Sequence, residues 1–352
     1  MRAPSRNGHG RDRPRVLVTG GAGFVGSHLA EALVARGCDV VALDNLSTGR
    51  LENVAPLIDS PHFELVVGDV RDDQVVDRLV SRSTAVFHLA AAVGVRLIID
   101  DPLGSIETNV HGTHVVLDRA AARGTKVLVA STSEVYGKGA RIPQGEDDDT
   151  MLGATRFGRW SYAASKMLDE FLALAYWRTA GLPVVVFRLF NTVGPRQTGL
   201  YGMVLPRFVE AALKDECLQV YGDGLQSRCF LHVRDAVAAI AGLAEVPGAV
   251  GGVFNVGSRE QVTILELARR VVRRVDPARL RNGCAPISLL PYEVAFPGGD
   301  FEDIRCRVPD VRKIQRVVGW KPRIRLDRII DDVIAERSER DAPVGGSLAP
   351  VA

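Results

Sequence analysis

The stretch T-G-G-A-G-F-V-G at residues 19–26 decides the fold of this 352-residue chain. It follows the apolar run V-L-V at 16–18 and precedes a helical pattern, so a tight turn joins a buried strand to a helix. Gly20, Gly23 and Gly26 leave the backbone amides and the helix N-terminus open to a pyrophosphate, which a side chain would block. The stretch therefore predicts a nucleotide-binding α/β fold.

Short β-branched runs alternate with longer helical patterns from Arg15 to about Leu189. This alternation predicts a doubly wound parallel sheet. After Asn191 the chain turns to Gly- and Pro-rich turns and shorter elements, which we expect to pack over the carboxyl ends of the strands. The predicted order is a disordered tail at 1–14, a dinucleotide-binding domain at 15–190, a mainly substrate-binding region at 191–337 and a disordered tail at 338–352. Within the substrate-binding region we expect helices near 204–214, 234–245, 263–275 and 326–337.

The composition limits the partners and the compartment. A content of 46% hydrophobic residues is enough for one large core or two smaller ones. The 44 basic and 42 acidic side chains are scattered, which argues against a nucleic-acid partner, and no apolar run approaches the ~18 residues of a membrane span. Five cysteines without C-x-x-C spacing indicate neither a disulfide framework nor a metal site. We therefore expect a cytoplasmic protein without a bound metal.

Asp44 closes the second apolar run, 18 residues after Gly26. A carboxylate at this place can hydrogen-bond both hydroxyls of a ribose, and it repels a 2′-phosphate. The position therefore favours NAD over NADP. The alternative is an aspartate that only caps the turn after a strand.

Tyr162 and Lys166 lie four residues apart in W-S-Y-A-A-S-K (160–166), on one face of a predicted helix. An ammonium group beside a phenol favours the phenolate and is expected to lower the tyrosine pKa from its usual value of about 10. Thr132, at the end of the preceding strand, offers a hydroxyl that can hold a reacting alcohol. Together the three residues predict a general base with its hydrogen-bonding partner.

Glu134, in S-T-S-E-V-Y-G at 131–137, is an unexpected residue for the end of a buried strand. This stretch follows the apolar run K-V-L-V-A, and buried strands of a parallel sheet rarely end in a glutamate. The residue therefore indicates chemistry at the strand end. The alternative is a glutamate held there by backbone amides.

The glycine spacing G-x-x-G-x-x-G, with Y-x-x-x-K and an upstream threonine, resembles the short-chain dehydrogenase/reductase superfamily and its Rossmann-type fold. The resemblance implies that Thr132 holds the reacting alcohol, Tyr162 takes its proton and NAD takes the hydride. D-N-L-S-T-G (44–49), G-D-V (68–70) and H-L-A-A (88–91) resemble further cofactor contacts. The implied NAD contacts are Gly20, Gly23, Phe24, Val25, Gly26, Asp44, Asn45, Ser47, Thr48, Gly49, Asp69, Val70, Leu89, Ala90, Ala91, Asn109, Tyr162 and Lys166.

The similarity covers about residues 15–335 and is closest to the extended branch that acts on nucleotide sugars. The stretches R-L-F-N-T-V-G-P-R (188–196), V-Y-G-D-G-L-Q-S-R-C-F-L-H-V-R-D (220–235) and F-E-D-I-R-C-R-V-P-D (301–310) resemble its diphosphate- and uridine-binding segments. Guanidinium groups match phosphate oxygens in pairs. The implied contacts to a UDP-sugar are Ser133, Asn191, Arg207, Tyr221, Arg228, Phe301 and Arg307.

The triplet T-S-E at 132–134 separates the reactions of this branch. It resembles UDP-glucuronate decarboxylases and GDP-mannose 4,6-dehydratases, whereas 4-epimerases carry small residues after the hydroxyl residue. Asp44 and the R-x-P-D stretch with Arg307 favour the decarboxylase, which would give UDP-xylose or the UDP-4-keto-pentose, with Glu134 and Arg307 orienting the sugar. The departure is A-A-A-V-G-V-R at 90–96, which resembles the epimerases and leaves Arg96 as a candidate for holding the sugar carboxylate.

Three other functions stay open. A UDP-hexose or UDP-glucuronate 4-epimerase and a nucleotide-sugar 4,6-dehydratase use the same fold and cofactor. A non-catalytic NAD-binding regulator is the alternative from another class, because a fold does not determine a function. Such a regulator is expected to lack Thr132, Tyr162 or Lys166, and the chain has all three.

The helix that carries Tyr162 is apolar in nearly every direction over 160–177. A helix that covers one face of a sheet needs only a single apolar stripe. The excess predicts a second buried face, and in the enzymes that the chain resembles this helix pairs with its twofold mate. We therefore expect a homodimer. The alternative is that the second region, or the polar segment 138–159, covers the helix.

Overall fold

The computed structural model describes residues 13–94, 98, 100–139, 141–199, 203–280, 286–296 and 302–341. Its centre is a sheet of seven parallel strands in the order β11-β6-β5-β4-β1-β2-β3. The strands are β1 (Arg15–Thr19), β2 (Asp39–Asp44), β3 (Phe63–Val67), β4 (Ala85–His88), β5 (Lys126–Thr132), β6 (Val184–Leu189) and β11 (Val253–Val256). The prediction of a doubly wound, Rossmann-type parallel sheet is confirmed.

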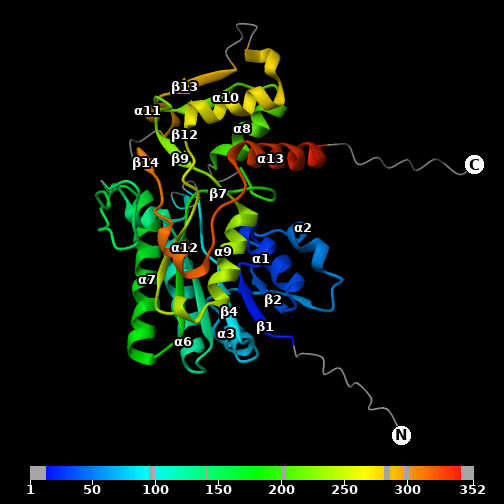
Figure 1. Cartoon of the computed structure of the whole chain (residues 1–352), viewed down its shortest axis with the longest axis vertical. Helices are drawn as coiled ribbons and strands as arrows, with labels where there is room; N and C mark the ends of the chain where they lie inside the picture. Colours follow the sequence, from blue (N-terminus) through cyan, green and yellow to red (C-terminus); the bar gives the residue numbers. More distant parts are fainter. Residues whose placement is uncertain are drawn as a thin grey trace, which may run out of the picture.

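Helices cover both faces of this sheet, as the lower part of Figure 1 shows. One face packs on α1 (Phe24–Ala35), α9 (Val233–Glu245) and α12 (Arg312–Val318), and the other on α3 (Asp73–Val80), α6 (Gly112–Ala121) and α7 (Arg159–Ala180). The strands are buried on both sides, which is why they read as continuous β-branched runs. The described connections also hold α2 (Leu51–Val54), η1 (Ala55–Leu57), α5 (Pro102–Ile106), the π-turn η2 (Glu107–His111), η3 (Ser133–Tyr136) and η4 (Pro247–Ala249).

A smaller region stands over the carboxyl ends of the strands, at the top of Figure 1. Its own core lies between α8 (Val204–Leu213), α10 (Ile264–Val275) and α13 (Leu326–Asp341). Its remaining elements are β7 (Thr192–Val193), β8 (Leu218–Tyr221), β9 (Ser227–Cys229), β10 (Leu231–His232), β12 (Gln261–Thr263), η5 (Pro277–Leu280), β13 (Ile287–Leu290), α11 (Tyr292–Ala295) and β14 (Cys306–Arg307). The four helices expected after Asn191 are all present.

The second half of the chain also returns to the central sheet. Residues 233–256 supply α9 and the seventh strand, β11, which pairs with β6 although it lies beyond the stretch from Arg15 to about Leu189 whose pattern predicts the sheet. The run V-F-N-V is short and lies among turns, so its β character is visible only in the pairing. A domain boundary at 190/191 stays a prediction, with α9 and β11 belonging to the sheet.

The chain ends differ in part from the expected tails. Arg13 donates to the carbonyls of Val34 and Cys38, which attaches the start of β1 to the end of α1. Helix α13 continues to Asp341, four residues past its predicted end, because S-E-R-D contains no helix breaker. Residues 1–12 and 342–352 lie outside the described part of the chain. None of the described helices combines the length and apolar character needed to span a membrane.

Candidate active site

A cavity of about 1180 Å³ runs along the carboxyl ends of β1, β2, β4, β5 and β6 and under the smaller region. In parallel α/β sheets this edge is where ligands bind. One end is lined by the glycine turn after β1, and the other by residues of α8, β8 and β14. The cavity is therefore long enough to reach from a dinucleotide to a second nucleotide.

The glycine turn leaves room for a pyrophosphate. Gly20 has a φ of +70°, and a side-chain carbon there would lie 2.8 Å from the backbone nitrogen of Ala90. A side chain at Gly26 would overlap the carbonyl of Gly20. Only glycine therefore permits this turn, whose amides face the cavity at the start of α1.

Asp44 is positioned by the backbone on both sides. Its Oδ2 accepts from the amide of Ala22 at 2.9 Å and its Oδ1 from the amide of Leu46 at 2.8 Å. The amide of Gly23 also acts on this carboxylate, and because a carboxylate has about four acceptor sites, one remains for a ribose hydroxyl. The turn and this aspartate fit the adenosine half of NAD.

Most of the predicted cofactor contacts line the cavity. Three of them, Gly49, Asp69 and Asn109, are not part of its lining. Gly49 packs against the carboxylate of Asp44, and a side-chain carbon there would be 2.6 Å from Oδ1. Asp69 accepts two bonds from the Arg71 guanidinium, which holds its pKa at about 2. Asn109 is buried. The predicted contacts that line the cavity are Gly20, Gly23, Phe24, Val25, Gly26, Asp44, Asn45, Ser47, Thr48, Val70, Leu89, Ala90, Ala91, Tyr162 and Lys166.

Asn109 holds the loop after β4. Its Oδ1 accepts from the amide of Ala92 at 2.8 Å, and its Nδ2 donates to Ser165 Oγ at 3.1 Å. The residue lies in the π-turn η2, and such turns are frequent at functional sites. Asn109 therefore connects this loop to α7, the helix that carries Tyr162.

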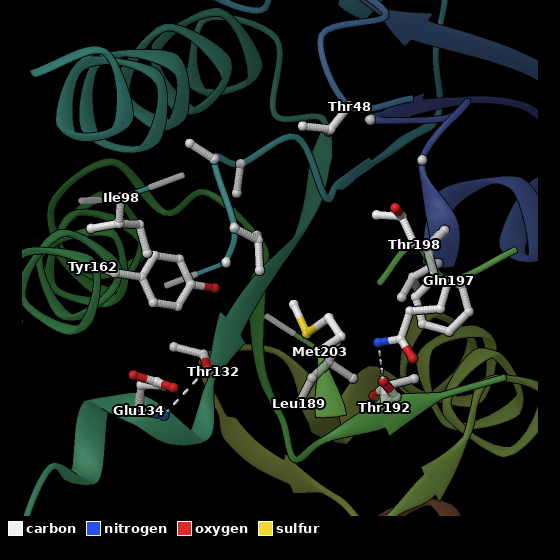
Figure 2. A pocket seen from close by; sticks show the side chains of 18 of the residues that line it. Thr48, Ile98, Thr132, Glu134, Tyr162, Leu189, Thr192, Gln197, Thr198 and Met203 are labelled. Atoms are coloured by element: carbon white, nitrogen blue, oxygen red, sulfur yellow. Dashed lines mark hydrogen bonds between the residues drawn. The ribbon is translucent and has the colours of Figure 1, made fainter. Parts of the chain in front are cut away.

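Thr132 and Tyr162 meet in the middle of the cavity. Figure 2 shows the Tyr162 ring reaching in from α7, with its hydroxyl directed toward the end of β5 where Thr132 and Glu134 lie. The Thr132 side chain lies close enough to the phenol of Tyr162 to lower its pKa, and it accepts from the amide of Glu134 at 3.2 Å. Burial first, and then the charge of Glu134, raise the pKa of Tyr162. The phenol is therefore protonated at neutral pH in this state.

The expectation that Lys166 lowers the pKa of Tyr162 is corrected by this geometry. Lys166 Nζ donates to Asp169 Oδ2 at 2.6 Å, and both side chains are buried. The negative charge of Asp169 offsets the ammonium and itself raises the pKa of Tyr162. The sequence pattern places Lys166 on the same face of α7 as Tyr162, but it does not show that Lys166 forms an ion pair with the aspartate three residues later.

Glu134 is held between two arginines. Arg307 Nη1 donates to Glu134 Oε1 at 3.1 Å, and Arg159 Nη2 to Oε2 at 3.3 Å. Burial alone would raise the pKa of Glu134, but the charges of Arg307 and Arg159 outweigh it and keep that pKa below its usual range. Glu134 is therefore a buried carboxylate that pairs with arginine side chains. The alternative, in which backbone amides hold this carboxylate, does not describe its contacts.

Arg159 is the site residue that the sequence patterns missed. It lies one helical turn before Tyr162 on α7 and is buried at 3% exposure. Residues three apart share a helix face, and this spacing was the available signal. Arg228 is the third buried guanidinium here; it donates to the Ile304 carbonyl and to Asp303 at 2.8 Å, and burial lowers its pKa to about 10.

The predicted sugar-nucleotide contacts gather at the other end of the cavity. The guanidinium of Arg207 lies 4.1 Å from the ring centroid of Tyr221, and Asn191 Nδ2 donates to the carbonyl of Cys229. Phe301 and Arg96 lie outside the described residues. The predicted substrate contacts that line the cavity are Ser133, Asn191, Arg207, Tyr221, Arg228 and Arg307.

Comparison with known proteins agrees with this geometry. Residues 17–333 match the protein family described as GDP-mannose 4,6 dehydratase. The chain belongs to the extended short-chain dehydrogenase/reductase family. The family prediction made from the glycine spacing and from Y-x-x-x-K is thereby confirmed.

Two curated relatives of this extended reductase are decarboxylases. A UDP-N-acetyl-α-D-glucosaminuronate decarboxylase from Bacillus cytotoxicus is 41% identical over 92% of this chain and 97% of its own length. UDP-glucuronic acid decarboxylase 1 from Arabidopsis thaliana is 36% identical over 95% of this chain and 72% of its own length.

Two solved structures of similar fold contain NAD. A dTDP-glucose 4,6-dehydratase from Streptomyces venezuelae superposes with a TM-score of 0.81 at 30% identity, over 93% of this reductase and 98% of that chain. A UDP-glucuronic acid 4-epimerase from Bacillus cereus, in complex with UDP-glucuronic acid and NAD, superposes with a TM-score of 0.80 at 25% identity, over 93% of this chain and 99% of that chain.

The role of Asp44 can be tested by cofactor choice. We expect Asp44→Ala to weaken NAD binding by about tenfold or more, because charge-assisted bonding to the ribose is lost, and to weaken NADP binding less. Calorimetric titration of the purified variant with each cofactor measures both effects. Equal weakening for NAD and NADP would contradict the assigned contact with the ribose.

Proposed function

We propose that this extended reductase is a UDP-hexuronate decarboxylase whose main substrate is UDP-glucuronate and whose products are UDP-xylose or the UDP-4-keto-pentose. One observation carries the proposal: Glu134 lies between two buried arginines, next to Thr132 and Tyr162. A reaction confined to carbon 4 of a sugar needs only the hydroxyl, the base and the cofactor. The additional carboxylate and cations indicate chemistry at the neighbouring carbon.

NAD is the cofactor of the chain. Gly20, Gly23 and Gly26 face its pyrophosphate and Asp44 its adenosine ribose, with Tyr162 at the reacting end. When bound, NAD accepts a hydride from carbon 4 of the sugar, returns it after decarboxylation and brings a positive charge to the site. That charge opposes the effects that raise the pKa of Tyr162.

Thr132 and Tyr162 act on the hydroxyl at carbon 4. Thr132 would hold this hydroxyl through its side-chain oxygen, and Tyr162 removes its proton. The resulting ketone is β to the sugar carboxylate, so the electrons left by departing carbon dioxide delocalise onto the ketone oxygen. A proton from solvent then adds to carbon 5, which restores the ketone, and Tyr162 returns its own proton to the carbon-4 oxygen when the ketone is reduced.

The arginines around Glu134 hold the carboxylate that leaves. Arg159, Arg228 and Arg307 bring three positive charges against the two negative charges of Glu134 and Asp303. The surplus positive charge favours a sugar carboxylate, and it also stabilises the enolate that forms when this carboxylate departs. The described residues 90–94 of the epimerase-like loop include no cation. In this proposal Arg159 provides the positive charge instead.

The similarity to the B. cytotoxicus enzyme favours UDP-N-acetylglucosaminuronate as a second substrate. The two UDP-hexuronates differ only in the substituent on carbon 2. Incubating the holoenzyme with each of them, and with UDP-glucose and UDP-galactose, then separating the products by mass spectrometry, tests the proposal. Loss of the carboxyl group from the hexuronates supports it, whereas a 4-epimer or a dehydrated hexose as the main product would replace it by one of the alternatives.

We also infer a homodimer formed through α7 and α5. Leu168 and Phe171 on α7 are 45% and 64% exposed, and Leu103 and Ile106 on α5 are 74% and 40% exposed. Neither the smaller region nor the described part of 138–159 covers them, so this apolar face has the character of a subunit interface. A cytoplasmic location, which rests on the cysteine usage of the sequence, completes the proposal.

The assembly can be tested by light scattering at micromolar concentration. We expect a dimer for the native chain and a monomer for Phe171→Glu, because a buried glutamate at an apolar interface would lack a partner. Leu225→Glu is the matched control, since Leu225 is 63% exposed in the smaller region and its variant should remain dimeric. A monomeric, active native protein would contradict the interface.

A further inference from the structure

A buried chain of polar side chains leads from the glycine turn to the lysine of the active site. Thr19 Oγ1 accepts from the amide of Ala90 at 3.2 Å and lies 2.8 Å from His88 Nδ1. His88 Nε2 lies 3.0 Å from Thr113 Oγ1, and the Thr113 side chain lies near enough to Asp169 to lower the pKa of that carboxyl. Asp169 accepts from Lys166. The polar side chains thus connect β1, β4 and α6 and end beside Asp169 on α7.

Burial governs the charges along this chain. Burial and the nearby Lys166 lower the pKa of His88 to about 3, so the imidazole is neutral. One of its ring nitrogens donates and the other accepts, between the hydroxyls of Thr19 and Thr113. Burial raises the pKa of Asp169, and the charge and hydrogen bond of Lys166 oppose this rise.

Asp169 is more than a structural counterion, because of where its charge lies. Its side chain is fully buried, and its partner Lys166 lines the cavity beside Tyr162. An ammonium has three donors, and Asp169 takes one of them, which leaves two for the cavity. Little water separates the carboxylate from Tyr162, so its charge acts on the phenol with weak screening.

We propose that Asp169 is a positioning residue that fixes the Lys166 ammonium and sets the pH at which Tyr162 releases its proton. The inference rests on the proposed function only in taking Tyr162 as the base. Neutralising Asp169 removes a buried negative charge that acts on the phenol, so Tyr162 becomes easier to deprotonate. The other charges around Tyr162 and Lys166 are Glu170 on α7, Glu134 on η3, Arg159 on α7 and Arg307 on β14, with neutral His88 on β4.

The test compares the native holoenzyme with Asp169→Asn in two titrations. In Asp169→Asn we expect the acidic limb of the kcat profile to move down by on the order of 1 pH unit, as for a unit charge several ångströms away at an effective dielectric constant of about 20. The ultraviolet absorbance of tyrosinate, corrected with Tyr162→Phe, should move in the same direction. This second readout needs no turnover, so it holds even if the substrate is another sugar nucleotide.

Two further variants keep the result decisive. Asp327→Asn makes the same chemical change on the exposed surface of α13 and should leave both titrations unmoved. In a Lys166→Met background the buried Asp169 loses the cation that lowers its pKa and becomes a neutral acid, so Asp169→Asn there should leave the tyrosinate midpoint unchanged relative to Lys166→Met alone. If both midpoints of Asp169→Asn coincide with those of the native protein, whatever happens to kcat, the proposal is overturned and the chain is structural.

Discussion

Tyr162→Phe is expected to lower kcat by about 10³-fold or more, while the affinity for the UDP-sugar stays within a few-fold. The change removes the hydroxyl assigned to take the proton from carbon 4, and it leaves the ring that fills the same space. Turnover of UDP-glucuronate and calorimetric binding of the same nucleotide measure the two quantities separately.

Tyr176→Phe is the matched control for this prediction. Tyr176 lies on the same helix, and its hydroxyl contacts Asp118 away from the cavity, so its variant should retain turnover. Near-normal turnover in Tyr162→Phe would remove the assigned base and, with it, the role given to Thr132.

Glu134→Gln is expected to lower the rate of carbon dioxide release by about 10²- to 10³-fold, with little change in NAD affinity. The amide has the shape of the carboxylate but not its charge, so Arg159 and Arg307 lose the anion that orients them. Stopped-time assays of carbon dioxide, together with NAD titrations, give both values.

Glu302→Gln serves as its control. The Glu302 side chain binds Lys138 and Trp160 close to the same arginines but outside the cavity, so the rate should stay within a few-fold. Unchanged carbon dioxide release in Glu134→Gln would show that the strand-end glutamate is structural.

The fold was predictable because its signals are local. The glycine turn at 19–26 and the β-branched runs are each contained in a short window, and β1, β3, β4 and β5 are each followed by a helix that packs on the sheet. Strand β11 was missed because its four residues show their role only beside β6. Pairing between segments about 70 residues apart has no counterpart in the pattern of either segment.

The same distinction separates the site residues. Thr132, Glu134 and Tyr162 were predictable because each stands at a fixed place in a strand end or helix turn, and all three line one cavity. The charge balance was not predictable. Whether Lys166 acts on Tyr162 or pairs with Asp169 depends on the packing of α6 against α7, and the grip of Arg159 on Glu134 depends on how α7 begins.

The most direct test of the central claim is the fate of the sugar carboxylate. Purified holoenzyme is incubated with UDP-glucuronate labelled at its carboxyl carbon, and the released gas is trapped and counted against the amount of nucleotide sugar consumed. The account predicts one labelled carbon dioxide for each UDP-glucuronate consumed, with a UDP-pentose left in solution. Consumption of UDP-glucuronate with the label retained in a nucleotide sugar, as in a 4-epimerisation, would contradict it.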